Sequence, residues 1–460
     1  MHKLSLPLII TAVLFAAATL LPLAFFDVET NAGNAELVRE IKEERLAEEQ
    51  LVKEPEISID NRKVTKHVPL PGQVKAIYMT SCVVGTPSFR DRLVRLVSET
   101  EINSIMIDIK DFSGTLSFLP ESEAWKSAWQ NSRCGARDMR EFIEALHEQG
   151  IFVIGRITVF QDPFYTSQRP ELAVKKADRT TVWKDYKGLS FIDVGARPYW
   201  DHLVDLVVDS YNVGFDELNF DYVRYPSDGP MNDIAFTHAE ASEYGNDKQA
   251  NLEAFFKYLN EQLSSEELFA DYRHENTGRA SNTPWTSADL FGMTTTNYND
   301  LSIGQVQDRA APYFDFIAPM VYPSHYPDGA FGYADPNDYP YQIVNYAMKT
   351  GVERMEASTT PMQGFLHEPL FVTNASGTKV LTGEYSKPVY GPNKFRTWIQ
   401  DFDYGGDYDA ADVRAQIQAS YDAGVMDWMI WAPSNIYTKA ALKESGYLEV
   451  STTSANGTEY

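Results

Sequence analysis

Carboxyl groups recur in one stretch that otherwise has the pattern of a buried strand, GFDELNFDYVRYP, residues 214–226. Side chains alternate between the two faces of a strand, so Glu217, Asn219 and Asp221 share one face and the apolar residues take the other. A carboxylate inside a fold costs free energy unless it is paired or performs chemistry. Such a carboxylate can act as a nucleophile or base, and Asp221, at the carboxyl end of the stretch, is the candidate for this role.

Acid–base chemistry also needs a carboxyl group that stays protonated, and the segment SADLFG supplies Asp289. Its apolar neighbours would raise its pKa and keep it protonated, as a general acid requires. Asp111, which ends another expected strand, is the best substitute for Asp289. Arg224 and Lys110 are candidates for keeping Asp221 ionised. The candidate catalytic residues are therefore Asp221, Asp289 and Asp111.

Charged side chains fall on the same side of two further expected strands, SIMIDIKD and FVIGRITVF. Asp108 and Lys110 alternate with isoleucines in the first, and Arg156 alternates with aliphatic residues in the second. These charges suit a substrate site, while a network of ion pairs that only holds strands together is the alternative. Asp162 follows the second strand, where it either contacts a substrate hydroxyl or begins a turn.

Sugar rings expose apolar C–H faces that stack on aromatic side chains. Tyr322, His325 and Tyr326 come from VYPSHY and Trp431 comes from IWAPSN, both at the ends of expected strands. Trp398 lies in a long loop, from which it could cover a cleft, although each of these rings could instead belong to the core. The candidate substrate-binding residues are Asp108, Lys110, Arg156, Asp162, Glu217, Asn219, Arg224, Tyr322, His325, Trp398 and Trp431. No His or Cys stands at ligand spacing from His325, so we expect neither a metal nor a cofactor.

Short apolar strands alternate with amphipathic helical stretches from about residue 74 onward. Eight such units favour a (β/α)8 barrel, the TIM barrel of the α/β class, over an open sheet. The expected strands are residues 75–81, 104–111, 152–160, 216–223, 283–292, 314–322, 356–365 and 426–433. Residues 366–409 are interpreted as an elaborated loop after the seventh strand. We expect the barrel domain to span residues 73–447 and a disordered tail to occupy residues 448–460.

The amino terminus is apolar and uncharged from residue 4 to residue 26, which matches the roughly 20 residues that span a bilayer. A secretory signal has a shorter apolar core of about 7 to 15 residues, so we favour an uncleaved anchor in residues 1–27 over a cleaved signal. Residues 28–72 are dense in charged side chains and are expected to form a spacer. Both interpretations place the barrel outside the cytoplasm, as part of a single-pass membrane protein or as a secreted one.

The chain of 460 residues carries 40 Lys and Arg against 65 Asp and Glu, a formal net charge of −25. Such a surface repels nucleic acid phosphates and anionic lipid headgroups, so a neutral or cationic polysaccharide is the more suitable partner. No loop of the GxxxxGKS type follows a strand, which argues against a nucleotide-binding protein.

The two cysteines, Cys82 and Cys134, lie after the first and second expected strands and are candidates for a disulfide.

The segment GFDELNFDYVRYP resembles a family of glycoside-hydrolase-like TIM-barrel domains found in secreted and membrane-anchored bacterial proteins. The resemblance covers roughly residues 73–437 and also includes INSIMIDIKDFSG, IGRITVFQD, SADLFG, FIAPMVYPSHY and RTWIQDF in this order. It implies the barrel fold and, by analogy, activity on carbohydrate.

A more distant likeness to enzymes of the α-amylase and melibiase type implies that Asp221, at the end of the fourth strand, is a nucleophile. The sequence departs from the α-amylase pattern because Asp289 stands where a Glu would end the fifth strand. Two hypotheses follow. The protein is either an anchored extracytoplasmic glycoside hydrolase or an inactive barrel that binds glycan in a structural role at the cell envelope.

Overall fold

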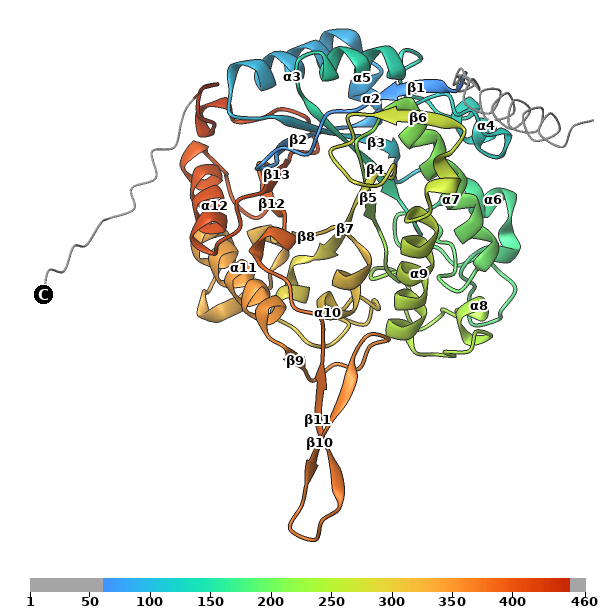
Figure 1. The fold of residues 1–460 in the computed structure, drawn as a ribbon, viewed down its shortest axis with the longest axis vertical. Helices are drawn as coiled ribbons and strands as arrows, with labels where there is room; N and C mark the ends of the chain where they lie inside the picture. Colours follow the sequence, from blue (N-terminus) through green and yellow to red (C-terminus); the bar gives the residue numbers. More distant parts are fainter. Residues whose placement is uncertain (1–60, 447–460) are drawn as a thin grey trace, which may run out of the picture. The chain divides into compact units, whose positions relative to one another are not determined.

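The computed structural model describes residues 61–446, in which eight parallel strands close into a barrel (Figure 1). The barrel strands are β2 (Lys75–Met79), β3 (Ser104–Lys110), β4 (Phe152–Thr158), β5 (Glu217–Asp221), β7 (Trp285–Phe291), β8 (Phe316–Met320), β12 (Thr397–Gln400) and β13 (Trp428–Trp431). They follow one another in chain order, and β13 pairs with β2 to close the ring. The prediction of a TIM barrel is confirmed.

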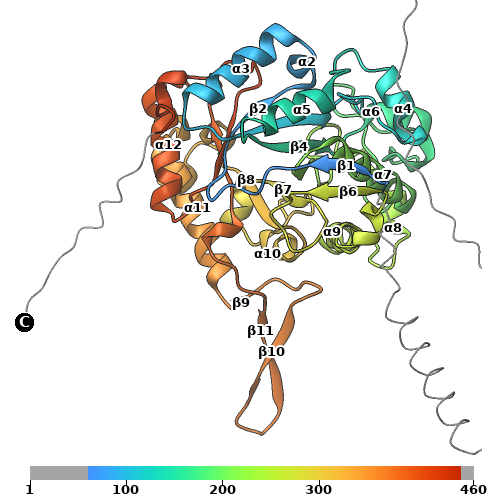
Figure 2. The same ribbon diagram turned by 45° about the horizontal axis from the view of Figure 1, so that its top comes forward.

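Helices cover the outside of the barrel (Figures 1 and 2). The α-helices are α2 (Ser81–Val84), α3 (Pro87–Glu99), α4 (Glu123–Gln130), α5 (Met139–His147), α6 (Pro163–Gln168), α7 (Arg197–Val213), α8 (Thr237–Glu240), α9 (Lys248–Leu263), α10 (Gln307–Ala310), α11 (Pro340–Glu356) and α12 (Ala410–Asp422). The 3₁₀ turns are η1 (Pro170–Leu172), η2 (Glu266–Phe269), η3 (Gly292–Thr295), η4 (Ala311–Tyr313), η5 (Pro323–His325), η6 (Ala330–Gly332), η7 (Pro336–Asp338), η8 (Pro392–Lys394) and η9 (Lys439–Ala441). Several of the helices begin with a side-chain cap, such as the Asp409 carboxylate that accepts from two backbone N–H groups at the start of α12.

Two apolar clusters hold the barrel together, one on each side of its wall. Ile107 of β3 and Leu218 of β5 belong to the large cluster between the strands and the helices. Met106 of β3 and Ile154 of β4 belong to a smaller cluster of alternate residues in the lumen. The alternation predicted from the sequence therefore separates the residues that meet the helices from those in the lumen, where apolar residues accompany the polar side chains.

The last residues of the predicted spacer belong to the folded body. β1 (Lys63–Lys66) pairs in parallel with β6 (Tyr272–Glu275), and the Thr65 hydroxyl donates to the Asn212 carbonyl over 2.8 Å. Val68 and Leu70 then pack against the lumen cluster. The predicted boundary between spacer and barrel domain at residues 72 and 73 is therefore too late, because residues 63–66 already pair with β6 and Val68 and Leu70 pack against the lumen cluster.

The seventh barrel strand is not residues 356–365, as the sequence suggested, but β12. Only β9 (Thr359–Thr360) forms in the predicted segment, and it pairs with a hairpin of β10 (Glu368–Thr373) and β11 (Lys379–Ser386). This hairpin extends away from the barrel in both views (Figures 1 and 2). The interpretation of residues 366–409 as a loop after the seventh strand was wrong, because that segment contains the strand.

The predicted membrane anchor in residues 1–27, most of the predicted spacer and the predicted tail at residues 448–460 lie outside the described residues. Within residues 61–446, none of the helices has both the length and the apolar character needed to cross a bilayer.

Candidate active site

Three lumen carboxyl groups lie at the carboxyl-terminal ends of their strands: Asp108 on β3, Asp221 on β5 and Asp289 on β7. Arg156 of β4 lies between the first two. Its Nη1 is 2.6 Å from Asp108 Oδ1, while its Nε and Nη2 donate to Asp221 Oδ2 over 3.1 and 2.5 Å. One guanidinium therefore pairs with two carboxylates at the rim where TIM-barrel enzymes carry their chemistry.

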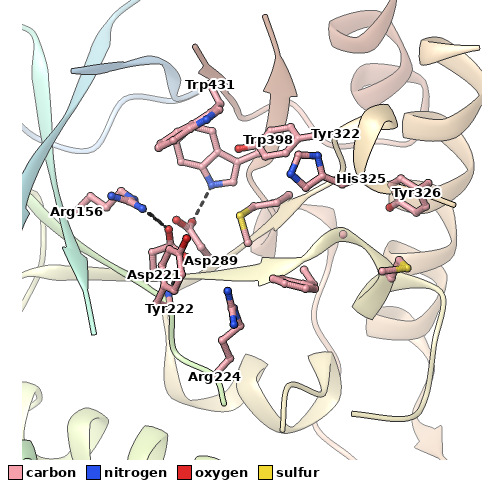
Figure 3. A pocket seen from close by; sticks show the side chains of 14 residues that line it. Arg156, Asp221, Tyr222, Arg224, Asp289, Tyr322, His325, Tyr326, Trp398 and Trp431 are labelled. Atoms are coloured by element: carbon pink, nitrogen blue, oxygen red, sulfur yellow. Dashed lines mark hydrogen bonds and ion pairs between the residues drawn. The ribbon is translucent and has the colours of Figure 1, made fainter. Parts of the chain in front are cut away.

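The second oxygen of Asp221 is bound by the backbone that follows it. The N–H of Tyr222 donates to Asp221 Oδ1 over 2.6 Å, and Tyr222 has a φ of 52°. A residue with a side chain adopts this left-handed conformation at a cost in free energy, which is often found at functional sites. The turn directs the Asp221 carboxylate into the barrel mouth, as Figure 3 shows.

Asp289 is fully buried and receives two hydrogen bonds on one oxygen. Trp398 Nε1 donates to Asp289 Oδ1 over 2.8 Å, and Asn219 Nδ2 donates to the same atom over 2.9 Å. Burial, followed by the negative charge of Asp221, raises the pKa of Asp289 to about 8. Within residues 61–446 no hydrogen bond reaches Asp289 Oδ2, so this oxygen is free to carry the proton.

Asp108 is the third carboxyl group of the site. The Tyr78 hydroxyl donates to its Oδ2, opposite the bond from Arg156. Burial raises the pKa of Asp108 to about 6, although the Arg156 charge and the two hydrogen bonds oppose the increase. Asp108 therefore titrates at a lower pH than Asp289 but well above an exposed Asp.

A chain of hydrogen bonds connects the rim to the base of the lumen. Asn219 Nδ2 also donates to Ser287 Oγ over 2.9 Å, and Ser287 Oγ donates to Glu217 Oε1 over 2.6 Å. The other Glu217 oxygen pairs with the buried Arg396. Glu217 is thus a deep supporting residue, and Asn219 holds Asp289 in place rather than facing the cavity.

Two adjoining cavities open over these carboxyl groups. The first has a volume of about 290 Å³, and Asp221, Asp289, Arg224, Tyr322 and Trp398 are part of its wall (Figure 3). The second has a volume of about 570 Å³ and includes Asp108, Tyr78 and Gln161. They share the side chains of Arg156, Tyr222, Arg224 and Trp431.

Aromatic rings form one side of the first cavity. The half-buried Trp431 stacks on Tyr78 with ring centroids 4.0 Å apart and meets Trp398 edge to face at 5.6 Å. Tyr322 and His325 contact each other edge to face and line the same cavity. The structure thus brings together four of the predicted binding residues, because β8, β12 and β13 are neighbours in the ring.

Besides Glu217 and Asn219, three further predicted site residues do not line the cavities. Lys110 pairs with Asp162 at 2.8 Å and donates to the Tyr199 hydroxyl of α7, because a register shift after Asp108 breaks the alternation of β3. It therefore does not contact Asp221. Asp162 caps α6 by accepting from the Tyr165 N–H over 2.7 Å, which agrees with the turn rather than the hydroxyl contact.

Asp111 is also outside the lining of both cavities. Its Oδ1 accepts from the N–H and the hydroxyl of Ser113, and its Oδ2 accepts from the Ser81 hydroxyl. These bonds fold the turn after β3. Asp111 is a poorer substitute for Asp289 than Asp108 is.

Trp398 does not cover the cleft from a loop, as predicted. It is a buried residue of β12 in the lumen, where it bonds to Asp289. The cavities also contain residues that were not predicted from the sequence: Tyr78, Gln161, Tyr222, Phe291, Met293 and Met320. Three of them have the parity of lumen residues in predicted strands and could have been found: Tyr78 in β2, Phe291 in β7 and Met320 in β8.

The two cysteines form a disulfide that joins α2 to the loop between α4 and α5, with Cα atoms 4.6 Å apart. Among the described residues, no group of three or more His, Cys, Asp and Glu side chains is arranged to hold a metal ion.

The closed barrel and the carboxyl groups at its rim define a TIM-barrel protein with a candidate site for carbohydrate chemistry. The profile of the family described as "Putative glycosyl hydrolase domain" matches residues 76–437, and the chain belongs to this family. The resemblance inferred from the sequence is confirmed. A comparison with curated proteins found no match.

Solved structures resemble this chain to different extents. The glycoside hydrolase domain of PgaB (BpsB) from Bordetella bronchiseptica is 12% identical with a TM-score of 0.51, over 81% of this chain and 99% of that chain. This likeness shows the fold. A hypothetical protein from Ruminiclostridium thermocellum is 30% identical over 41% of this chain and 92% of that chain, with a TM-score of 0.35. The alpha-L-fucosidase isoenzyme 2 from Paenibacillus thiaminolyticus is 12% identical with a TM-score of 0.44, over 82% of this chain and 48% of that chain.

Proposed function

We propose that the protein is a glycoside hydrolase that cleaves a polysaccharide outside the cytoplasm, with Asp221 as nucleophile or base and Asp289 as general acid. One observation carries the proposal: both carboxyl groups line the same cavity, but their surroundings favour opposite protonation states. Asp221 is paired with Arg156, whereas Asp289 has a pKa of about 8 and holds its proton at neutral pH. This is the division of roles that glycoside hydrolysis requires.

The contacts of Asp289 support the role of acid. Its free Oδ2 donates the proton to the leaving oxygen, and the negative charge that develops is then stabilised by the hydrogen bonds from Trp398 and Asn219. The Arg156 guanidinium and the Tyr222 N–H orient the Asp221 carboxylate toward the opposite side of the bond. These donors are in place before substrate arrives, so little reorganisation is needed during the reaction.

The shape of the cavities supports an oligosaccharide substrate. A volume of about 290 Å³ suits a single sugar ring beside the carboxyl groups, and the larger second cavity receives a neighbouring ring. Trp431 belongs to both walls, so its face can stack against sugar on either side of the cleavage point.

The extracytoplasmic location rests on the apolar run in residues 4–26 and on the disulfide between Cys82 and Cys134. Disulfides persist in oxidising compartments and are rare in the cytoplasm. We propose a single-pass membrane anchor for the chain. Fractionation of cells, followed by protease treatment of intact cells or spheroplasts, tests it: a barrel in the soluble cytoplasmic fraction contradicts the location.

An inactive glycan-binding barrel remains the second candidate, because both oxygens of Asp221 already accept hydrogen bonds. A reducing-end release assay separates the two functions. The full chain is tested on a panel of surface polysaccharides beside Asp221→Asn, Asp289→Asn and the control Asp111→Asn. Release that is lost in the first two variants and retained in the third supports a hydrolase. Glycan retention without any release supports the binding barrel.

A further inference from the structure

Arg224 brings a positive charge to the boundary between the two cavities. It lines both of them, is 9% exposed, and its side chain points into the first cavity in Figure 3. Its Nη1 donates to the Tyr225 carbonyl over 3.0 Å. Among residues 61–446, however, no carboxylate forms an ion pair with it, and Asp221 is paired with Arg156 instead.

The other buried arginines of the described part of the chain behave differently. Each of them pairs with a carboxylate: Arg156 with Asp108 and Asp221, Arg309 with Glu253, Arg354 with Asp308, and Arg396 with Glu217. Removing a guanidinium from water costs free energy that a carboxylate partner normally offsets. Arg224 is the exception among these buried arginines: it lines both cavities, as Arg156 does, but has no carboxylate partner of its own.

The guanidinium of Arg224 is held in a defined orientation by its neighbours. Its Cζ lies 4.7 Å from the ring centroid of Tyr222, just after β5, and 4.9 Å from that of Phe291 in β7, so aromatic rings contact it from two segments of the chain. Burial lowers the pKa of Arg224 from its usual value, but a guanidinium stays charged at neutral pH. A charged fork fixed in this way is prepared for a planar anion.

We propose that Arg224 binds the carboxylate of an acidic sugar, so that the substrate is a glycan that contains uronic acid or another sugar bearing a carboxyl group. The inference rests on the proposed function and narrows its substrate. It differs from the expectation of a neutral or cationic polysaccharide, which relied on the net charge of −25 for the whole chain. Net charge governs long-range repulsion, whereas recognition depends on the groups that contact the ligand.

Binding of simple sugars to the full chain tests the charge preference without a known polymer. D-glucuronate and D-galacturonate are titrated against D-glucose and D-galactose by NMR. We expect the acidic member of at least one pair to bind about tenfold more tightly or better, because hydrogen bonds to charged groups are stronger than neutral ones. Arg224→Gln abolishes the preference, Arg224→Lys retains part of it, and Arg92→Gln on the exposed face of α3 leaves it unchanged. Equal binding of acidic and neutral sugars, or a preference that survives Arg224→Gln, overturns the proposal.

Further probes test which class of anion binds and where on the sugar the carboxylate is attached. Inorganic phosphate that binds as tightly as D-glucuronate, with the same dependence on Arg224, overturns carboxylate recognition. N-acetylmuramic acid, whose carboxylate is on an ether substituent, is compared with D-glucuronate, whose carboxylate is on the ring. Arg224-dependent binding of either one supports the proposal and identifies the source.

Hydrolysis distinguishes failure of this inference from failure of the proposed function. An acidic polysaccharide that the protein cleaves is compared with the same polymer after its carboxyl groups are reduced to alcohols. Arg224→Gln should lower kcat/KM on the acidic polymer by about 10- to 100-fold and change it less than about twofold on the reduced polymer. Equal losses on both polymers mean that Arg224 acts through Asp221, and the inference fails while the hydrolase stands. If uronate binding depends on Arg224 but no polymer is cleaved, the inference about Arg224 stands and the proposed hydrolase function fails.

Discussion

Trp398 Nε1 lies 2.8 Å from Asp289 Oδ1, a contact that joins β12 to β7 across the lumen of the barrel. The donor favours the ionised form of Asp289 and so opposes the effect of burial on its pKa. In the proposed mechanism this bond decides how readily the acid gives up its proton. The buried Trp398 side chain therefore influences the protonation state of Asp289.

The first prediction concerns Trp398→Phe. Loss of a hydrogen bond worth about 1.5–3 kcal/mol to a charged acceptor raises the pKa of Asp289 further above about 8. The alkaline limb of the kcat/KM profile, where Asp289 loses its proton, should then move to higher pH, with a lower rate at the optimum. A profile measured from pH 5 to 10 checks this. An unchanged alkaline limb would assign the acid to another group.

The second prediction is a pH-dependent gain in stability for Asp289→Asn. In the unfolded chain this carboxyl group has a pKa near 3.9, whereas in the native protein the value is about 8. Its contribution to stability is full below about pH 4 and is lost as the pH rises toward 8, because only the unfolded state releases the proton. Denaturation by urea at pH 5 and pH 7.5 measures the free energy of unfolding. Relative to the parent, the free energy of unfolding of the variant should increase by about 1 kcal/mol per pH unit. Parallel curves at the two pH values contradict the raised pKa.

The third prediction concerns Arg156→Met. The substitution leaves Asp108 and Asp221 buried without their cation, which costs about 3–5 kcal/mol of stability. The pKa of Asp108 then rises above about 6, so the loss of stability should be smaller at pH 5 than at pH 8. Arg95→Met on the exposed face of α3 is the control and should change stability by less than about 0.5 kcal/mol. Equal losses at both pH values would argue against the pairing.

The fourth prediction concerns the disulfide. Cys82 and Cys134 are 52 residues apart, and the double change to Ser should lower the free energy of unfolding by about 2–4 kcal/mol. Neither cysteine lines the first or the second cavity, so kcat/KM should stay within about twofold below the melting temperature. Calorimetry and the release assay measure the two effects. Loss of activity in a folded variant would connect this loop to the site.

The fifth prediction separates the hairpin from the barrel. Phe371 and Leu381 pair across β10 and β11 but are 52% and 59% exposed, so this hairpin buries little apolar surface. Replacing residues 370–383 with a short Gly-Ser linker should shift Tm by only a few degrees and leave release intact. Replacing Thr397–Gln400 should prevent folding, because the barrel would lose a strand. A variant without the hairpin that fails to fold contradicts this division.

Local periodicity accounts for most of what could be predicted. Alternation of polar and apolar residues placed Glu217, Asn219 and Asp221 in the lumen, and the succession of strands and helices predicted the barrel. The prediction that Asp221 and Asp289 lie at the same site followed from their positions at strand ends, and both line the first cavity. The alternation and the order of strands and helices depend on residues that are close in the chain, so both can be predicted from the sequence.

Errors occurred where long-range contacts override the local pattern. A four-residue strand such as β12 is too short to show a period, and its place is decided by pairing with β13 along its whole length. A single register shift in β3 turned Lys110 away from Asp221 and toward Asp162.

Amino-acid types and their periodic spacing therefore predicted the barrel, the polar side chains on the lumen side of its strands and the positions of Asp221 and Asp289 at strand ends. Only the tertiary structure decided that Arg156 pairs with Asp221 and that the Trp398 indole bonds to Asp289. It also decided that Arg224 lines the cavity without an ion pair to a carboxylate. The reason is that a partner is chosen by distance and desolvation between strands far apart in the chain, and neither quantity is encoded in a local repeat.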